Sequence, residues 1–345
     1  MKKYNVAVIG YGWASTAHIP AINATTQARV TAVCSSRPLD AAELSARHGG
    51  PIEVLASFDE VLRRPDIHAV SICSLPSQHA AQVIAAARAG KHIILEKPIS
   101  LTLADAHAVA AAVQAAGVQV CVCFECRYSS QFLATKAVID AGLLGQLHYG
   151  EVDYYHGIGP WYGQFRWNVR RDGGGSSLLS AGCHAMDALL LCMGSEVESV
   201  TSTATKSFSP TFAPYEYPST SVTLVRFKNG AVGKVASVID CVQPYYFHTH
   251  LVGSDGSLLD RKFHSAKLAV DKHHWSELSM KLLDSGDVSD HPYQTQFQAF
   301  FDAVDAGRAM PLTSLDEAMR SHLACLAADL SAAQNRTVAL AELHG

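Results

Sequence analysis

The sequence has no long hydrophobic run and no strong excess of charge of either sign. No apolar stretch in its 345 residues reaches the length of about 18–20 residues that a membrane-spanning helix needs. Lysine and arginine number 27 against 31 aspartates and glutamates, so the formal net charge is −4. A mildly acidic chain lacks the electrostatic footprint that nucleic acids and anionic membranes require. We therefore expect neither as a partner, whereas a hydrophobic content of 48% supports a large folded core.

We expect neither a disulfide framework nor a secretory leader. Its nine cysteines are odd in number and have no framework spacing, which favours a reducing compartment. The basic start, Lys2-Lys3, passes at once into Val6-Ala7-Val8-Ile9, which is too short for the apolar core of a signal peptide. We expect a cytoplasmic protein.

No complete set of metal ligands is evident. Three cysteines lie close together, at Cys121, Cys123 and Cys126, but the valine-rich segment around them predicts a buried strand in which cysteine is a small apolar residue. Two histidine pairs have zinc-like spacing: His248-x-His250 and His273-His274. No neighbouring carboxylate or cysteine completes either pair, so we expect no metal and assign these histidines structural roles.

Over the first 125 residues, short apolar runs alternate with amphipathic segments. Five runs predict strands because they are rich in valine, isoleucine or cysteine and end at turn residues: Asn5–Gly10, Arg29–Cys34, Ala69–Cys73, His92–Leu95 and Val118–Phe124. Helices are predicted between them, and two of these stop at glycines, Gly90 and Gly117. This alternation predicts an α/β domain over residues 1–126, with a parallel sheet covered by helices on both faces.

Residues 127–345 have a different pattern of apolar and polar residues, which predicts an α+β domain. Five strands follow without long helices between most of them: Leu147–His156, Val197–Lys206, Thr220–Lys228, Ala231–Val242 and Phe247–Gly253. Asn229-Gly230 is a strong hairpin signal between two of these, so the sheet should be mostly antiparallel. Two terminal helices, Tyr293–Ala306 and Leu315–Asn335, can pack back on the first domain.

A glycine pair, Gly10-x-Gly12, follows the first predicted strand and precedes a helix. Glycines at such a turn let the backbone approach a pyrophosphate, which then lies at the helix N-terminus. The third glycine position holds Ser15, whose small side chain still permits close packing. The alternative is an ordinary strand–helix turn that uses glycine only for a positive φ.

The acidic residue that would bind a ribose 2′-hydroxyl is missing. It is expected about 20 residues beyond the glycines, where the chain reads Val33-Cys34-Ser35-Ser36-Arg37. Two hydroxyls and an arginine suit a 2′-phosphate, so the sequence favours NADP over NAD. The alternative is that Arg37 is a solvated loop residue.

Six segments carry a family resemblance, in chain order: Gly10-Tyr11-Gly12, Leu75-Pro76-Ser77-Gln78-His79, Ala89-Gly90-Lys91-His92-Ile93-Ile94-Leu95-Glu96-Lys97-Pro98, Gly173-Gly174-Gly175, Gly182-Cys183-His184-Ala185-Met186-Asp187 and His291-Pro292-Tyr293. Through them nearly the whole chain resembles the Gfo/Idh/MocA oxidoreductases, named for glucose–fructose oxidoreductase and inositol dehydrogenase. The resemblance implies a Rossmann domain followed by a domain with a large, open, mostly antiparallel sheet. It also implies hydride transfer between a nicotinamide and a hydroxyl-bearing or carbonyl carbon of a sugar, sugar derivative or cyclic polyol.

The resemblance supplies two catalytic candidates. A histidine suits the transfer of a hydroxyl proton because its pKa lies near neutrality, and His184 matches the family's catalytic histidine. Lys97 matches the family's active-site lysine, whose ammonium group would stabilise a developing alkoxide. The family pattern Asp-x-Gly-x-His-x-x-Asp begins here with Ser180, which implies a different substrate, a different proton relay or lost activity. Asp187 either orients His184 or closes a network at a helix terminus.

Further site residues are expected around these motifs. For the cofactor they are Gly10, Gly12, Trp13, Ala14, Ser35, Ser36, Arg37, Ser74, Leu75, Pro76, His79, Glu96, Lys97 and Arg127. For the substrate they are Lys97, Tyr154, Trp161, Trp167, Ser180 and His184, with His156 and Arg166 as weaker candidates. Aromatic faces stack on sugar rings, although ordinary packing explains any one of these aromatics equally well.

Two other functions remain open. Ser180 and Ser15 are compatible with a dinucleotide-binding sensor whose active site has degraded, and a lyase or glycosidase with a transient hydride step would use the same cofactor. The resemblance also implies a homodimer or homotetramer that associates through the open sheet. Val222, Leu224, Val232 and Val235 suit such an interface, although packing of the sheet against helices explains them equally well.

Overall fold

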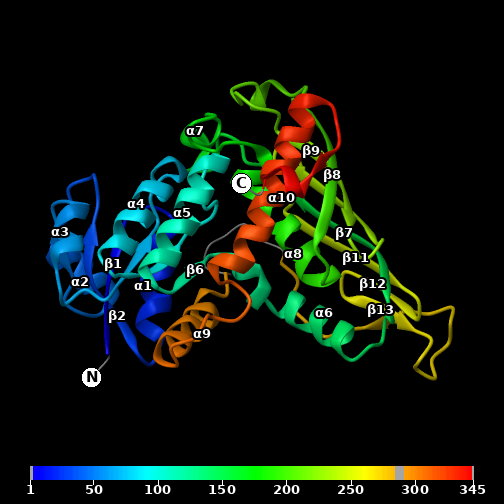
Figure 1. Cartoon of the computed structure of the whole chain (residues 1–345), viewed down its shortest axis with the longest axis horizontal. Coiled ribbons are helices and arrows are strands. Elements are labelled where there is room, and N and C mark those ends of the chain that lie inside the picture. The colour runs from blue at the N-terminus through cyan, green and yellow to red at the C-terminus, as the bar shows by residue number, and fades with distance from the viewer. Residues whose placement is uncertain (1–2, 284–290, 344–345) are drawn as a thin grey trace. The chain divides into compact units, whose positions relative to one another are not determined.

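The computed structural model describes residues 3–283 and 291–343, and their contacts form two units. The first unit takes in the described residues up to Glu125 together with those from His291 to Met319. The second takes in the described residues from Cys126 to Leu283 and those from Arg320 to Leu343 (Figure 1). In the part of the chain that is described, no helix has the length and apolar character needed to cross a membrane.

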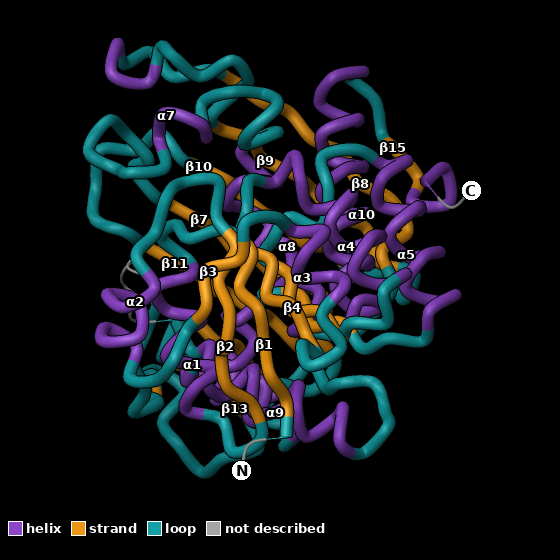
Figure 2. Tube along the Cα trace, turned by 90° about the vertical axis from the view of Figure 1, so that its left-hand side faces the viewer, coloured by secondary structure: helices purple, strands orange, loops and turns teal. Residues whose placement is uncertain are grey.

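The first unit is built on a parallel sheet of six strands in the order β3-β2-β1-β4-β5-β6. The strands are β1 (Tyr4–Ile9), β2 (Ala28–Cys34), β3 (Glu53–Leu55), β4 (Ala69–Ile72), β5 (His92–Leu95) and β6 (Val120–Val122). All five predicted strands are present, and Figure 2 shows β2, β1 and β4 running side by side. The sequence analysis missed β3, because it has only three residues and only Leu55 among them is buried.

Helices cover both faces of this sheet. They are α1 (Ser15–Ala24), α2 (Ala41–His48), α3 (Phe58–Arg63), α4 (Pro76–Arg88), α5 (Leu103–Ala116) and α9 (Tyr293–Asp305). The strand order reverses between β1 and β4, so right-handed crossovers place the helices on opposite faces. Thus α4 packs beside α5, and α1 packs beside α9 (Figure 1). The reversal is the position at which open α/β sheets bind their ligands.

The second unit contains a sheet of nine strands in the order β14-β13-β12-β11-β7-β10-β9-β8-β15. The strands are β7 (Leu147–Tyr155), β8 (Val197–Thr205), β9 (Thr220–Phe227), β10 (Val232–Val238), β11 (Tyr246–Gly253), β12 (Gly256–Leu259), β13 (Lys262–Ser265), β14 (Ser276–Glu277) and β15 (Val338–Ala339). Every neighbouring pair is antiparallel except β10 with β7, which confirms the mostly antiparallel prediction. The predicted hairpin at Asn229-Gly230 joins β9 to β10, with a φ of 87° at Gly230.

Helices pack against one face of this sheet. The remaining helices are α6 (Ser130–Asp140), α7 (Phe165–Asn168), α8 (Cys183–Met193) and α10 (Leu315–Gln334), and short 3₁₀ turns lie at Glu125–Tyr128, Pro210–Phe212 and Leu340–Leu343. Helix α8 packs on β7 and β10, where Leu189 lies against Gly150 and Gly233. On the opposite face Leu224 is 58% exposed and Val232 is 46% exposed.

One residue of the predicted interface set lies on the wrong face. Val235 is completely buried, and it shares the helix-covered face of β10 with Gly233. Side chains alternate along a strand, so Val232 and Val235, three residues apart, point to opposite faces. The uncovered face therefore keeps Val222, Leu224 and Val232, whose register places them together, and loses Val235.

Candidate active site

The glycine turn between β1 and α1 has the geometry of an anion-binding loop. Gly10 has a φ of 89°, and a Cβ there would lie 2.8 Å from the carbonyl oxygen of Cys73, so this position requires glycine. A Cβ on Gly12 would meet nothing within 4 Å, which leaves open space above the turn. Ser15 is fully buried and bonds the Gly12 carbonyl at 2.7 Å, so serine is accommodated at the third position.

The N-terminus of α1 is also free of competing side chains. Neither a side-chain cap nor an acidic residue occupies its first turn, whereas Asp40, Ser57 and Thr102 cap α2, α3 and α5. Uncapped N–H groups at a helix N-terminus attract a phosphate. The residues present thus fit the pyrophosphate of a dinucleotide. Trp13, 37% exposed, and Ala14 belong to the same turn.

Arg37 lies against the glycine turn. Its guanidinium donates to the carbonyl oxygen of Tyr11, and its backbone N–H bonds Ser35 Oγ at 3.2 Å. The arginine and Ser36 are exposed just beyond the carboxyl end of β2. A positive charge is therefore held beside the turn, at the position where a ribose 2′-substituent is recognised in this kind of sheet.

The loops after β4 and β5 are tied together by His79. This histidine is buried on α4, with Nδ1 2.6 Å from the Pro98 carbonyl oxygen and Nε2 3.2 Å from that of Ser74. Burial lowers the pKa of His79. The imidazole thus links the backbone of the loop after β4 to that of the loop after β5, whose Lys97–Pro98 peptide bond is cis. Its predicted cofactor contact stays a prediction, as do those of Ser74, Leu75 and Pro76.

A buried ion pair lies directly beside Lys97. Glu96 Oε1 accepts hydrogen bonds from His18 Nε2 at 2.9 Å and from the Tyr293 hydroxyl at 2.8 Å. Burial alone would raise the pKa of Glu96, but His18 and the Lys97 charge outweigh it and lower that pKa to about 2. The other carboxylate oxygen accepts the backbone N–H of Lys97 at 3.2 Å. Glu96 therefore stays ionised and fixes the start of the lysine loop.

His18 was not predicted from the sequence, and no role was predicted for Tyr293. His18 is fully buried, and its Nδ1 lies 2.9 Å from Ser71 Oγ and 3.3 Å from Cys73 Sγ. A polar residue among the apolar positions of a predicted helix is the one sequence signal for His18, because a buried polar side chain needs a polar partner. Tyr293 was part of the recognised His291-Pro292-Tyr293 segment, but its hydrogen bond depends on tertiary structure.

In the second unit, Ser180 and His184 lie on a distorted helix entry. Residues Leu178–Gly182 form a π-helical turn that runs directly into α8, and such turns are frequent at functional sites. A Cβ on Gly182 would lie 2.2 Å from Ser237 Oγ, so glycine is required where this turn meets β10. His184 is buried, with Nδ1 3.7 Å from Cys126 Sγ.

Asp187 is engaged by a buried arginine. Arg127 Nε and Nη2 each bond one Asp187 oxygen at 2.7 Å, and Ser321 Oγ bonds Oδ1 at 2.6 Å. This bidentate pair is almost completely inaccessible to solvent. Of the two readings of Asp187, the contacts favour a structural network. Arg127 thus has a buried partner in Asp187. Its predicted contact with the cofactor stays a prediction.

Aromatic side chains gather at the end of β7. Tyr154, His156, Tyr162 and Tyr245 contact one another edge to face, with ring centroids 5.2–5.9 Å apart. Tyr154 and His156 are joined by a 3.0 Å hydrogen bond. Tyr162 and Tyr245 were not predicted, and the ring partners of Tyr245 are distant from it in sequence. Trp161 instead packs on Phe212 and is 65% exposed, whereas Trp167 lies in α7.

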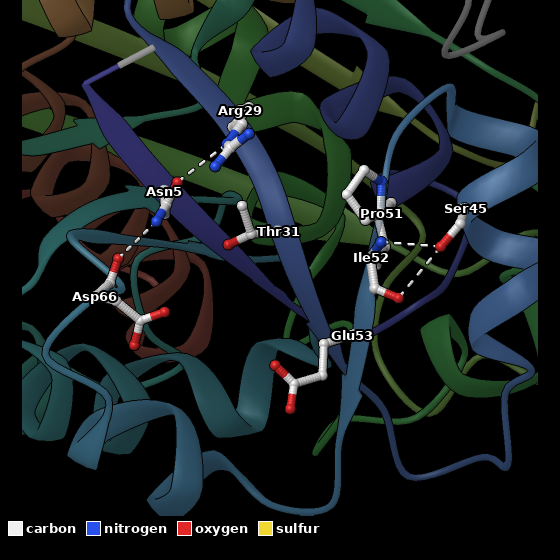
Figure 3. Close-up of a pocket in the computed structure, with 8 residues that line it drawn as sticks. All are labelled: Asn5, Arg29, Thr31, Ser45, Pro51, Ile52, Glu53 and Asp66. Atoms are coloured by element: carbon white, nitrogen blue, oxygen red, sulfur yellow. Dashed lines mark hydrogen bonds between the residues drawn. The ribbon is translucent and has the colours of Figure 1, made fainter. Parts of the chain in front are cut away.

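A polar pocket in the first unit lies at the amino ends of the strands, opposite to the end that carries the glycine turn (Figure 3). Its lining residues are Asn5, Arg29, Thr31, Ser45, Pro51, Ile52, Glu53 and Asp66. Most of these are at or just before the amino ends of β1, β2, β3 and β4. The glycine turn follows the carboxyl end of β1, so the pocket is distinct from the candidate cofactor site.

Two family models match the chain, and both agree with the predicted resemblance. Residues 4–124 match an oxidoreductase family with an NAD-binding Rossmann fold, and residues 132–259 match the GFO/IDH/MocA C-terminal domain. The site residues are thus divided between two recognised domains, with Lys97 in the first unit and His184 in the second.

Curated relatives match over most of their length. Myo-inositol 2-dehydrogenase of Thermotoga maritima is 25% identical over 340 residues, which is 99% of each chain. The NAD(+) scyllo-inositol 2-dehydrogenase of Bacillus subtilis is 28% identical over 82% of this chain and 81% of its own. A levoglucosan dehydrogenase structure with NADH and levoglucosan has a TM-score of 0.86 and 23% identity, covering 98% of this chain and all of that one. At that identity the structural match shows a shared fold.

Proposed function

The chain belongs to the Gfo/Idh/MocA oxidoreductase family, whose members include nicotinamide-dependent dehydrogenases, and we propose that it oxidises or reduces a sugar, sugar derivative or cyclic polyol. The reaction is a hydride transfer between NAD(P) and a carbon bearing a hydroxyl or carbonyl. One observation carries the proposal: a single lysine follows β5 on a loop fixed by the buried Glu96–His18 pair and by His79. A rigidly placed cation is what a developing alkoxide requires.

The two catalytic roles are divided between the units. We propose that the Lys97 ammonium group hydrogen-bonds the reacting oxygen and stabilises its negative charge. His184 exchanges the hydroxyl proton, since imidazole can do so near neutral pH. A dinucleotide whose pyrophosphate is held at the glycine turn would supply or accept the hydride through its nicotinamide ring. Ser180 and the aromatic cluster of Tyr154, His156, Tyr162 and Tyr245 would orient the substrate hydroxyls and rings.

We propose NADP as the preferred cofactor. Arg37 is held beside the glycine turn, and Ser35 and Ser36 add hydroxyls at the end of β2. Val33–Arg37, at the end of the second strand, contains no carboxylate. In NAD-binding Rossmann domains an acidic residue at this position binds the ribose 2′-hydroxyl.

The first test is activity with a panel of inositols, aldoses, uronates and glycosides, each with NAD and with NADP. Replacing Lys97 by alanine should lower kcat by about 10²–10³-fold with the cofactor dissociation constant nearly unchanged, the usual effect of losing one preorganised donor. Lys228→Ala, an exposed lysine of the second unit paired with Glu196, is the matched control and should retain activity. Unaltered turnover of the Lys97 variant would refute the assigned role.

A second candidate function rests on Ser180. Serine cannot carry the negative charge of the aspartate in the family pattern, so this position is compatible with a dinucleotide-binding sensor. The same panel separates the two: cofactor binding without turnover of any substrate supports the sensor. A lyase or glycosidase with a transient hydride step would convert substrate with no net change in cofactor oxidation state.

A further inference from the structure

Three metal-ligating side chains meet on the uncovered face of the second unit's sheet. Glu151 from β7 and His248 and His250 from β11 each offer one ligand atom, and these atoms lie within 4.8 Å of one another. The sheet register explains the meeting. Glu151 stands directly opposite His250, and His248 is two residues along the same face. By the same alternation Tyr154 of the aromatic cluster points to the other face, so this group is separate from the candidate active site.

The His248-x-His250 pair was expected to be structural because no carboxylate lies near it in the sequence. That premise is wrong in three dimensions. Glu151 is remote from both histidines in sequence, and only the antiparallel pairing of β7 with β11 brings it to them. The pairing could not be deduced from local spacing, because the two strands are separated along the chain by three others.

His248 is already oriented for ligation. Its Nδ1 lies 3.3 Å from Asp260 Oδ1 and 3.0 Å from the Tyr246 hydroxyl. Asp260 is itself fixed by the Tyr246 hydroxyl at 2.7 Å and by the Thr249 N–H at 2.9 Å. Donation from Nδ1 leaves the Nε2 lone pair available. Metal-ligating histidines commonly have this carboxylate partner on the second ring nitrogen.

The other two groups can reach an ion without leaving a charge unpaired. Glu151 Oε1 is 2.7 Å from Lys234 Nζ, and Oε2 accepts the Tyr149 hydroxyl at 2.9 Å. Lys234 also bonds Asp153 at 2.7 Å, so it keeps an anionic partner when Glu151 turns to a cation. Among the described residues His250 has ring contacts with Tyr149 and His248 but no hydrogen bond to either ring nitrogen.

We propose that Glu151, His248 and His250 form a binding site for a divalent transition metal of the zinc type. Two imidazoles and one carboxylate are an established zinc set, and they leave a fourth position for water or another ligand. With bonds of about 2.0–2.1 Å, a tetrahedral ion holds its ligand atoms about 3.3 Å apart. The three atoms now lie within 4.8 Å of one another, so binding requires rotations of these partly exposed side chains that shorten the separations to that spacing. The ion would tie β7 to β11.

The test is direct titration of the full-length protein, first stripped with a chelator, using Zn²⁺ in competition with a chromogenic indicator. Wild type should bind one Zn²⁺ per chain, and Co²⁺ should give the visible absorption of a tetrahedral site. His250→Ala and Glu151→Gln should weaken binding by about 100-fold or more, and Asp260→Asn, which removes only the orienting carboxylate, by about tenfold.

His148→Ala is the matched control, because His148 is an exposed histidine on the same strand but outside the cluster. It should bind Zn²⁺ as wild type does. Circular dichroism of each variant checks that it is folded, and His250→Gln replaces His250→Ala if the alanine variant is not. The proposal fails if wild type binds no ion at micromolar Zn²⁺. It also fails if folded His250 and Glu151 variants bind as tightly as wild type, which would mark scattered surface histidines as the ligands.

Discussion

The Glu96 carboxylate is the residue on which the lysine loop depends. It bonds His18, Tyr293 and the Lys97 backbone at once, inside a nearly solvent-free site. Removing one partner of a buried ion pair costs about 3–5 kcal/mol, because the other charge is left without compensation. Glu96→Gln should therefore lower the free energy of unfolding by about 3 kcal/mol, measured by denaturant titration at pH 7.

The pH dependence of the same variant gives a second readout. The pKa of Glu96 in the folded protein, about 2, lies below its unfolded value, so its contribution is complete above about pH 4.5 and is lost as pH falls towards 2. For His18, burial lowers the pKa, but Cys73 and Glu96 outweigh it and raise the pKa overall. The stability gap between wild type and Glu96→Gln should thus be largest between about pH 4.5 and 6.5, and it should shrink both in acid and as pH rises above about 6.5, where unfolded His18 loses its proton. A gap that widens in acid would contradict the ion pair.

Arg37 should decide between the two cofactors. A hydrogen bond to a charged group contributes about 1.5 kcal/mol or more, which corresponds to about tenfold in affinity. Arg37→Ala should raise the NADP dissociation constant by at least that factor and change the NAD constant little, as measured by fluorescence titration. Arg29 is an exposed arginine at the amino end of β2, the end opposite to Arg37. Arg29→Ala is therefore the control and should change neither dissociation constant. Equal losses for both cofactors would show that Arg37 only supports the glycine turn.

At the scale of single elements, helix α10 combines two buried ionisable groups with opposite effects. Burial raises the pKa of Asp329 to about 7, although Ser176 hydrogen-bonds it at 2.6 Å and favours the ionised form. Burial lowers the pKa of His322 to about 3. The folded state therefore holds an extra proton at Asp329 between about pH 4 and 7 and lacks one at His322 between about pH 3 and 6.5.

From these two pKa shifts we predict opposite effects of pH on the free energy of unfolding. Asp329 makes it fall with rising pH and His322 makes it rise, so the two effects offset one another in the wild type. In Asp329→Asn the offset is gone, so stability should rise with pH up to about 6.5 and exceed that of wild type at pH 8 by about 2–4 kcal/mol. In His322→Gln stability should fall between about pH 4 and 7. Urea unfolding at a series of pH values checks both. Parallel curves for the two variants would mean that neither group titrates as described.

Elements with strong local signals were predictable, and those fixed by tertiary contacts were not. The strands of the first unit end at turn residues and consist of buried apolar side chains, so their positions follow from the sequence. Strands β12 to β15 have two to four residues each and carry too little periodicity to recognise. The π-helical turn before α8 was also not foreseen, because it depends on the close approach of Gly182 to Ser237.

The same division applies to the candidate site. Gly10, Arg37 and Lys97 are marked by local motifs that precede or follow predicted strands. His18, Tyr245 and the Glu151–His250 pairing owe their positions to packing between elements that are distant in sequence. Asp187 illustrates the intermediate case: its motif was recognised, but only its contacts with Arg127 and Ser321 favour one of its two readings.

For the whole molecule, we propose self-association through the uncovered face of the second unit's sheet. Leu224 and Val232 are large hydrophobic residues left 58% and 46% exposed there, and Val222 lies on the same face. Large apolar side chains left exposed together on one sheet face commonly mark a protein interface. Wild type should therefore be a dimer or tetramer by size-exclusion chromatography with light scattering, in keeping with the family resemblance.

Placing a carboxylate on that face should separate the subunits, because burying an ionised side chain is costly even with Lys234 opposite position 224. Leu224→Glu, alone or with Val232→Glu, should give a folded monomer. Leu133→Glu is the matched control, because Leu133 is 46% exposed but lies on α6 and not on the sheet. A monomeric wild type would refute the proposal. An oligomer that persists in both glutamate variants would show that the subunits associate through another surface. Loss of association in the Leu133 variant as well would point to general destabilisation, which the unfolding measurements described above can detect.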